Sequence, residues 1–94
     1  MQDYIWETPS EINKNLADRI KKIRKRKKIS QKELAERCNV SYGSVKRFEQ
    51  TGDISLLSLT KIAMELGVSN EIINLFTRVP YNSLEEVRNE RKNS

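Results

Sequence analysis

Residues 30–49 read SQKELAERCNVSYGSVKRFE, and this stretch decides the fold. Ser30 and Glu33 have the S-x-x-E spacing of a capping box, which predicts a helix that begins at Gln31. Asn39 tolerates the left-handed backbone conformation in which helices commonly end, so this first helix is expected to be short.

A second short helix is expected to follow at once, because Ser41 is an N-cap residue in front of residues 42–50. Val45 and Phe48 are its inward pair, and its other side chains are polar or small. Two short helices joined by a tight turn are typical of a helix-turn-helix, in which the second helix enters the major groove of DNA. The residues offered to DNA are Tyr42, Ser44, Lys46 and Arg47 on the free face, and Gln31 at the N-terminus of the first helix, where free N–H groups suit a phosphate.

Two longer helices are predicted around this pair. One covers about residues 11–27, with Ser10 as its cap, and the other begins at Ser55 or Ser58 and ends before Gly67. The apolar residues expected to face inward are Ile12, Leu16, Ile20 and Ile23 in the former and Leu59, Ile62, Ala63 and Leu66 in the latter.

The C-terminal third predicts two weaker helices. The first begins at Ser69 or Asn70, carries Ile72, Ile73 and Phe76, and is stopped by Pro80. Phe76 is expected in the core. The second covers about residues 84–91. The fold is therefore expected to be all-α, with five short helices around one core and a weak sixth.

Composition narrows the function. The 94 residues hold 18 Lys plus Arg against 13 Asp plus Glu, a net charge of +5 that favours a polyanionic partner, nucleic acid first and an anionic membrane second. With no histidine and only Cys38, no disulfide within the chain and no zinc ligand set is available. No catalytic constellation is recognisable, so neither an enzyme nor a cofactor is expected. The N-terminus lacks signal-peptide features and no 18-residue apolar run exists, so we expect a soluble, cytoplasmic protein.

The stretch from Ile20 to Gly67 resembles the Cro/CI (XRE) helix-turn-helix family, through ISQKELAERCNVS, VKRFE and SLTKIAMELG. The resemblance implies a five-helix DNA-binding domain and a buried ion pair between Arg24 and Glu49. Two positions depart from the family pattern: the turn glycine is Asn39, and Gly43 has no side chain where the family often has a polar reader.

The resemblance also assigns DNA contacts residue by residue. Ser30 and Gln31 match phosphate-touching positions, Tyr42, Gly43 and Arg47 match base-reading positions, and Ser44 and Lys46 flank them. The full set of expected DNA-binding residues is Ser30, Gln31, Ser41, Tyr42, Gly43, Ser44, Lys46 and Arg47. We expect double-stranded DNA as the partner and a homodimer that reads two half-sites about 34 Å apart.

A narrower resemblance covers the flanks. YIWETPSEI, FEQTGDISL and LFTRVPYNSLEEVRNERK are similar to XRE regulators paired with HipA-type kinases, which implies a HipB-like antitoxin that binds a kinase toxin. The predicted organisation is an N-terminal arm over residues 1–9, a DNA-binding domain over 10–78 and a C-terminal extension over 79–94.

Several assignments stay open on sequence alone. Residues 19–28, RIKKIRKRKK, either face phosphate or form a solvated helix end. Arg47 either reads a guanine or contacts phosphate, and Tyr42 either contacts DNA or packs in the core. Arg24 is either half of the ion pair or free for phosphate. Tyr4 and Trp6 are either a partner-binding arm or a staple over a helix.

Overall fold

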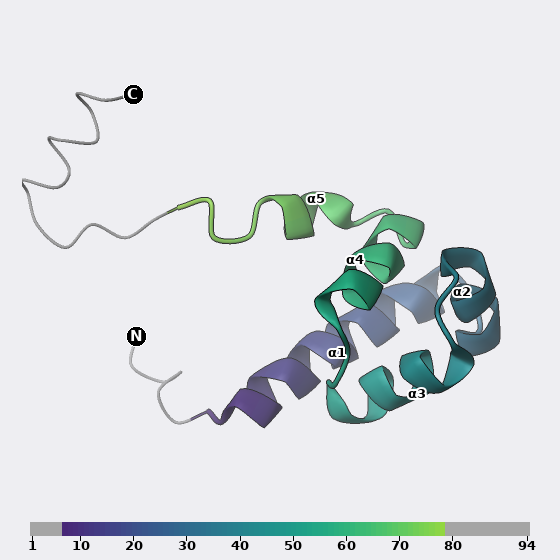
Figure 1. The fold of residues 1–94 in the computed structure, drawn as a ribbon, viewed down its shortest axis with the longest axis horizontal. Coiled ribbons are helices and arrows are strands. Elements are labelled where there is room, and N and C mark those ends of the chain that lie inside the picture. The colour runs from purple at the N-terminus through teal and green to yellow at the C-terminus, as the bar shows by residue number, and fades with distance from the viewer. Residues whose placement is uncertain (1–6, 79–94) are drawn as a thin grey trace, which may run out of the picture.

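The computed structural model describes residues 7–78 of the chain, and they form five helices. The helices are α1 (Pro9–Arg26), α2 (Gln31–Cys38), α3 (Tyr42–Thr51), α4 (Leu56–Glu65) and α5 (Ser69–Ile73). Figure 1 shows α1 passing behind α4 and lying beside α3, with α2 at one end of the molecule and α5 toward the other. The all-α prediction is confirmed for this part of the chain. The Tyr4–Trp6 arm and the helix expected over residues 84–91 lie outside it.

The start of α1 corrects the prediction that Ser10 caps it. Thr8 is the N-cap: the Glu11 amide donates to Thr8 Oγ1 at 3.1 Å, and the Thr8 amide donates to Glu11 Oε1 at 2.8 Å. Pro9 is the first helical residue, where its missing N–H leaves no hydrogen bond unmade. The helix ends at Arg26, one residue earlier than expected.

The helix-turn-helix forms as the sequence predicts. Ser30 and Glu33 make a reciprocal capping box at the start of α2, and Asn39 ends that helix in the left-handed region with φ 56°. Ser41 Oγ then accepts from the Ser44 amide at 3.1 Å and caps α3. Local hydrogen-bonding chemistry therefore sets both boundaries of the turn.

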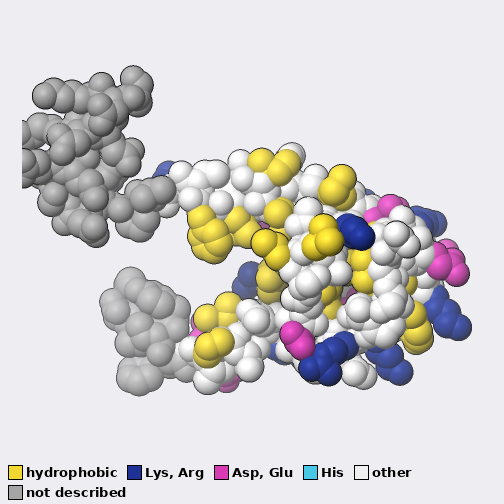
Figure 2. Space-filling view, in the orientation of Figure 1, with side chains coloured by type: hydrophobic (Ala, Val, Ile, Leu, Met, Phe, Trp, Pro, Cys, Tyr) yellow, Lys and Arg dark blue, Asp and Glu magenta, His cyan; other side chains and the backbone are white. Residues whose placement is uncertain are grey.

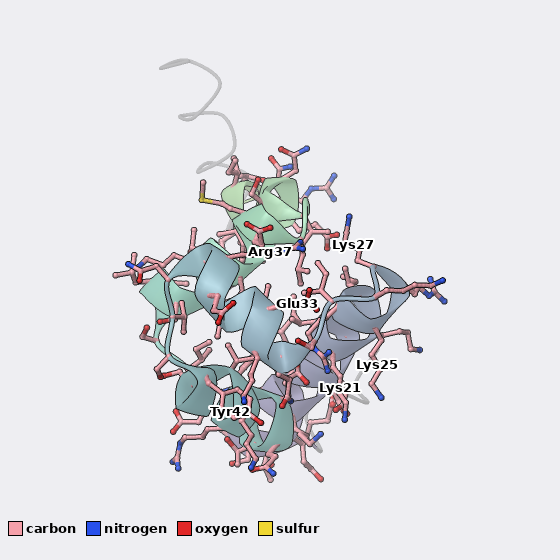
Figure 3. The ribbon with its side chains drawn as sticks, turned by 90° about the vertical axis from the view of Figure 1, so that its right-hand side faces the viewer. Lys21, Lys25, Lys27, Glu33, Arg37 and Tyr42 are labelled. Carbon is pink, nitrogen blue, oxygen red and sulfur yellow. The ribbon has the colours of Figure 1, made fainter. Side chains whose placement is uncertain are left out.

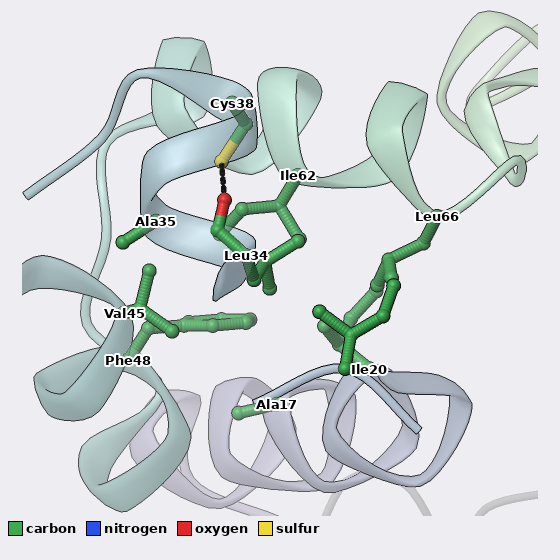
Figure 4. Close-up of a cluster of buried hydrophobic side chains, with 10 residues drawn as sticks. Ala17, Ile20, Leu34, Ala35, Cys38, Val45, Phe48, Ile62 and Leu66 are labelled. Atoms are coloured by element: carbon green, nitrogen blue, oxygen red, sulfur yellow. Dashed lines mark hydrogen bonds between the residues drawn. The ribbon is translucent and has the colours of Figure 1, made fainter. Parts of the chain in front are cut away.

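The core lies between α1, α2, α3 and α4 (Figure 4). Its buried apolar residues are Ala17, Ile20, Ile29, Leu34, Ala35, Cys38, Val45, Phe48, Ile62, Ala63 and Leu66. The Cys38 thiol donates to the Leu34 carbonyl oxygen at 2.9 Å, and burial raises the pKa of that thiol. Cys38 is thus a protonated core residue.

Two predicted apolar faces are only partly buried. Ile12 and Leu16 on α1 are 49% and 38% exposed, although Ile20 on the same face is buried. The prediction that Phe76 joins the core is wrong, since its side chain is 88% exposed. The reason is that α5 ends at Ile73, well before Pro80, so the residues beyond it no longer follow a helical face.

The turn after α3 is tight. Gly52 has φ 85°, and a Cβ added there would lie 2.6 Å from the backbone carbonyl carbon of Asn13 in α1. Only glycine allows both that conformation and that approach. None of the helices within residues 7–78 is long and apolar enough to cross a bilayer.

Candidate nucleic-acid interface

A buried ion pair fixes α3 to α1. Arg24 donates through Nε to Glu49 Oε2 at 2.6 Å and through Nη2 to Glu49 Oε1 at 2.9 Å. The third guanidinium nitrogen, Nη1, donates to the Ile29 carbonyl oxygen at 2.7 Å. Arg24 is 7% exposed and Glu49 is 3% exposed. The expected ion pair is confirmed, and Arg24 is not free for phosphate.

Gln31 extends this network to α2. Its Nε2 donates to Glu49 Oε1 at 2.8 Å, so the amide links the first residue of α2 to the inner side of α3. The α2 backbone around Gln31 still presents the N–H groups of a helix N-terminus. A phosphate contact at this position therefore depends on the backbone N–H groups and on the second N–H of the Gln31 side-chain amide.

The outer face of α3 is exposed. Tyr42, Gly43, Lys46 and Arg47 are exposed, and Ser44 is half-buried. Tyr42 is 41% exposed, so the alternative that it packs in the core is wrong. A Cβ added at Gly43 would meet no atom within 4 Å, which leaves room for a close approach from outside.

Two lysines lie near the Tyr42 ring. Lys32 Nζ is 5.7 Å and Lys46 Nζ is 6.0 Å from the ring centroid, distances at which cation–π attraction operates. Lys32 was not among the residues predicted from the sequence, because its proximity to Tyr42 arises only from the packing of α2 against α3. Ser41 and Ser30 hold their hydroxyls in the caps of these two helices.

Arg47 pairs with Asp53, a residue just beyond the end of α3. Arg47 Nε donates to Asp53 Oδ2 at 2.9 Å, and Arg47 Nη2 lies 2.9 Å from the same oxygen. The side chains are 66% and 64% exposed. No helical spacing predicts a contact between positions six apart, because the chain leaves the helix between them.

The C-terminal half of α1 adds positive charge beside α2. Figure 3 shows Lys21 and Lys25 projecting on the α1 side of the start of α2, with Tyr42 on the other side. Lys25, Lys27 and Lys28 are exposed. Within residues 7–78 the ion pairs use other cations, Lys14, Arg24, Arg37 and Arg47.

A family model described as "Helix-turn-helix" matches residues 20–72, more than half of the chain. Searches of curated proteins and of solved structures found no match to the chain. The matched span contains the capped turn, the Arg24–Glu49 ion pair and the exposed face of α3. The chain therefore belongs to the Cro/CI-type helix-turn-helix family of DNA-binding transcriptional regulators.

Proposed function

We propose that the protein is a sequence-specific regulator, acting as a repressor, that binds an operator as a homodimer with α3 in the major groove. The observation that carries this proposal is the division of α3 into two faces. Val45, Phe48 and Glu49 are buried, while Tyr42, Lys46 and Arg47 are exposed. An anchored helix with a free polar face is what groove reading requires.

The contacts divide into base-reading and backbone-positioning groups. Arg47 reads a guanine edge, while Tyr42 and Gly43 approach neighbouring bases. Ser41, Ser44 and Lys46 flank them, and the N-termini of α2 and α3 face phosphates at Ser30 and Gln31 and at Ser41. Lys25 and Lys28 extend the phosphate-binding surface beyond α2, because they are exposed at the end of α1.

Selection of duplexes from a random DNA pool tests this proposal. An inverted repeat with a defined half-site spacing is the expected result for a dimer. Arg47→Ala should lose the sequence preference at one base position. Lys25→Ala should weaken binding to all sequences and lower by about 0.9 the magnitude of the slope of log K against log salt concentration. Lys61→Ala is the matched control. It removes the same charge, but Lys61 lies beside the C-terminal end of α2, whereas the proposed phosphate contacts lie at the N-terminus of that helix. Retention of duplexes with no shared sequence would refute the proposal.

The homodimer is supported by an apolar surface away from α2. A groove between α1, α4 and α5 is lined by Leu16, Arg19, Ile20, Ile23, Leu59, Ala63, Val68, Glu71, Ile72 and Leu75. Figure 2 shows hydrophobic side chains gathered on the α5 side and near the start of α1, at the end of the molecule opposite α2. Under two-fold symmetry an interface is self-complementary, and the groove carries one residue of each charge, Arg19 and Glu71, that two copies could pair.

Leu75→Ser tests this dimer surface without a large cost to the fold, because Leu75 lines the groove and is 50% exposed. Sedimentation should show a weakened dimer, and binding to the inverted repeat should fall while a single half-site is bound as before. Met64→Ser is the control, since Met64 is 64% exposed and lies outside the groove. Equal sedimentation of the wild-type protein and Leu75→Ser would refute the assignment.

The alternative function is an antitoxin-type protein that binds a HipA-type kinase toxin. It depends on flanking segments that lie largely outside residues 7–78. Because Thr8 caps α1, a deletion that tests the N-terminal arm should stop at residue 6. Loss of kinase capture after deletion of residues 1–6 or 83–94, with DNA binding retained, is the result expected for this function.

A further inference from the structure

The Arg47–Asp53 pair has the geometry of a positioning contact. Both Nε and Nη2 of Arg47 lie 2.9 Å from a single oxygen, Asp53 Oδ2, so the carboxylate meets the side edge of the guanidinium. Both side chains are about two-thirds exposed, and ion pairs at such sites contribute little to folding stability. The main consequence of the contact is the orientation of Arg47.

The backbone that carries Asp53 is itself fixed to α3. Thr51 Oγ1 donates to the Arg47 carbonyl oxygen at 2.8 Å and accepts from the Asp53 amide at 3.1 Å. Gly52, between them, lies against the α1 backbone at Asn13. The hydrogen bonds form a closed ring from Arg47 through Thr51 and Asp53 back to Arg47. The carboxylate is therefore presented by an ordered turn.

The pairing leaves a defined set of donors for DNA. A guanidinium has five N–H groups; Nε donates to Asp53 Oδ2, and Nη2 has the same oxygen 2.9 Å away on one side. The two N–H groups of Nη1 and the second N–H of Nη2 remain. One from each nitrogen forms the terminal edge of the fork, whose spacing matches O6 and N7 of guanine.

We propose that Asp53 is a specificity-determining residue that holds Arg47 with its terminal edge toward a guanine in the major groove. This inference rests on the proposed function. Asp53 acts in a second way, since an exposed carboxylate at the end of the reading helix repels phosphates that approach out of register. Both effects raise the preference for the correct sequence, and the second lowers the affinity for other DNA.

The test compares Asp53→Ala with the wild-type protein by competition between the selected duplex and duplexes with the Arg47-dependent guanine replaced. Asp53→Ala should reduce the preference for guanine about fivefold or more, within the discrimination of one bidentate contact. It should also bind unrelated duplexes more tightly. Asp53→Asn keeps an oxygen that accepts from Arg47 and should show a smaller loss of preference.

Asp18→Ala is the matched control. Asp18 is an exposed carboxylate paired with Lys14 on α1, so its removal changes the net charge equally without removing a contact of Arg47 or Asp53. It should leave the preference for guanine unchanged. Circular dichroism melting of each variant checks that the fold is kept.

The outcomes separate this inference from the proposed function. Wild-type protein that selects no shared sequence refutes both. A wild-type preference that disappears in Arg47→Ala but keeps its full size in both Asp53 variants refutes the role of Asp53 alone. That result would mean that Arg47 leaves Asp53 on binding DNA. A preference for guanine that survives in Arg47→Ala also refutes it.

Discussion

Replacing Glu49 with alanine should destabilise the protein more than any exposed substitution, because it removes the acceptor of three buried or half-buried hydrogen bonds. Two come from Arg24, at 2.6 and 2.9 Å, and one comes from Gln31 at 2.8 Å. Arg24 would keep only its bond to the Ile29 carbonyl oxygen. Its charge would then be buried without a counter-ion.

The expected cost is about 3–5 kcal/mol, the range for removing one partner of a buried ion pair. A chain of 94 residues has a free energy of unfolding of about 5–14 kcal/mol, so the loss is a large share of the total. At about 4 °C or more per kcal/mol, the melting midpoint should fall by at least about 12 °C.

Thermal and urea unfolding, followed by circular dichroism, measure this loss. Asp18→Ala removes a carboxylate from an exposed pair and should cost less than about 1 kcal/mol. The double variant Arg24→Met, Glu49→Leu should recover much of the stability, because two apolar side chains leave no buried charge. A loss of less than about 1 kcal/mol in the free energy of unfolding of Glu49→Ala would refute the reasoning, since removing one partner of a buried ion pair should leave an uncompensated charge.

Three further predictions concern the caps and glycines. Gly43→Ala should raise the free energy of unfolding by up to about 1 kcal/mol, because α3 gains a better helix former where nothing obstructs a Cβ; a lower melting midpoint would contradict this. Gly52→Ala should lower it by at least about 1 kcal/mol in urea unfolding, because φ is 85° and Asn13 blocks a Cβ; unchanged stability would contradict the close approach. Hydrogen bonds from the Ser30 amide and hydroxyl hold the pKa of Glu33 below its ordinary value of 4.5. The Glu33 contribution to stability should be complete above that pH and be lost as pH falls through the lowered pKa, so melting midpoints of wild type and Glu33→Gln should converge only in acid.

Local chemistry made the helix-turn-helix predictable. The capping box at Ser30, the left-handed Asn39 and the Ser41 cap each depend on residues within four positions of one another, and all three form. The prediction that Ser10 caps α1 is wrong because the helix already begins at Pro9. Proline suits the first helical position because its missing N–H would have no partner there, and Thr8 supplies the cap.

Tertiary features were harder to predict. Ile72, Ile73 and Phe76 have helical spacing, but spacing cannot show that α5 ends at Ile73 or that the Phe76 side chain lies exposed beyond it. The Arg24–Glu49 pair was expected only through the family resemblance, because the residues are 25 positions apart. The Arg47–Asp53 contact depends on a turn geometry that no periodic pattern encodes.

The two carboxylates that contact arginines around α3 act differently because of where they lie. Glu49 and Arg47 are two positions apart, hence about 200° around the helix, on opposite faces. A ten-residue helix is unstable alone, so the buried pair and the core must set its orientation. Because the Arg47–Asp53 pair is exposed, DNA can reach the terminal edge of the Arg47 guanidinium while Asp53 holds its side edge. Substitutions at Glu49 should therefore change affinity through the folded fraction and through the released Gln31 amide, without changing sequence preference. Substitutions at Asp53 should change sequence preference in a fully folded protein.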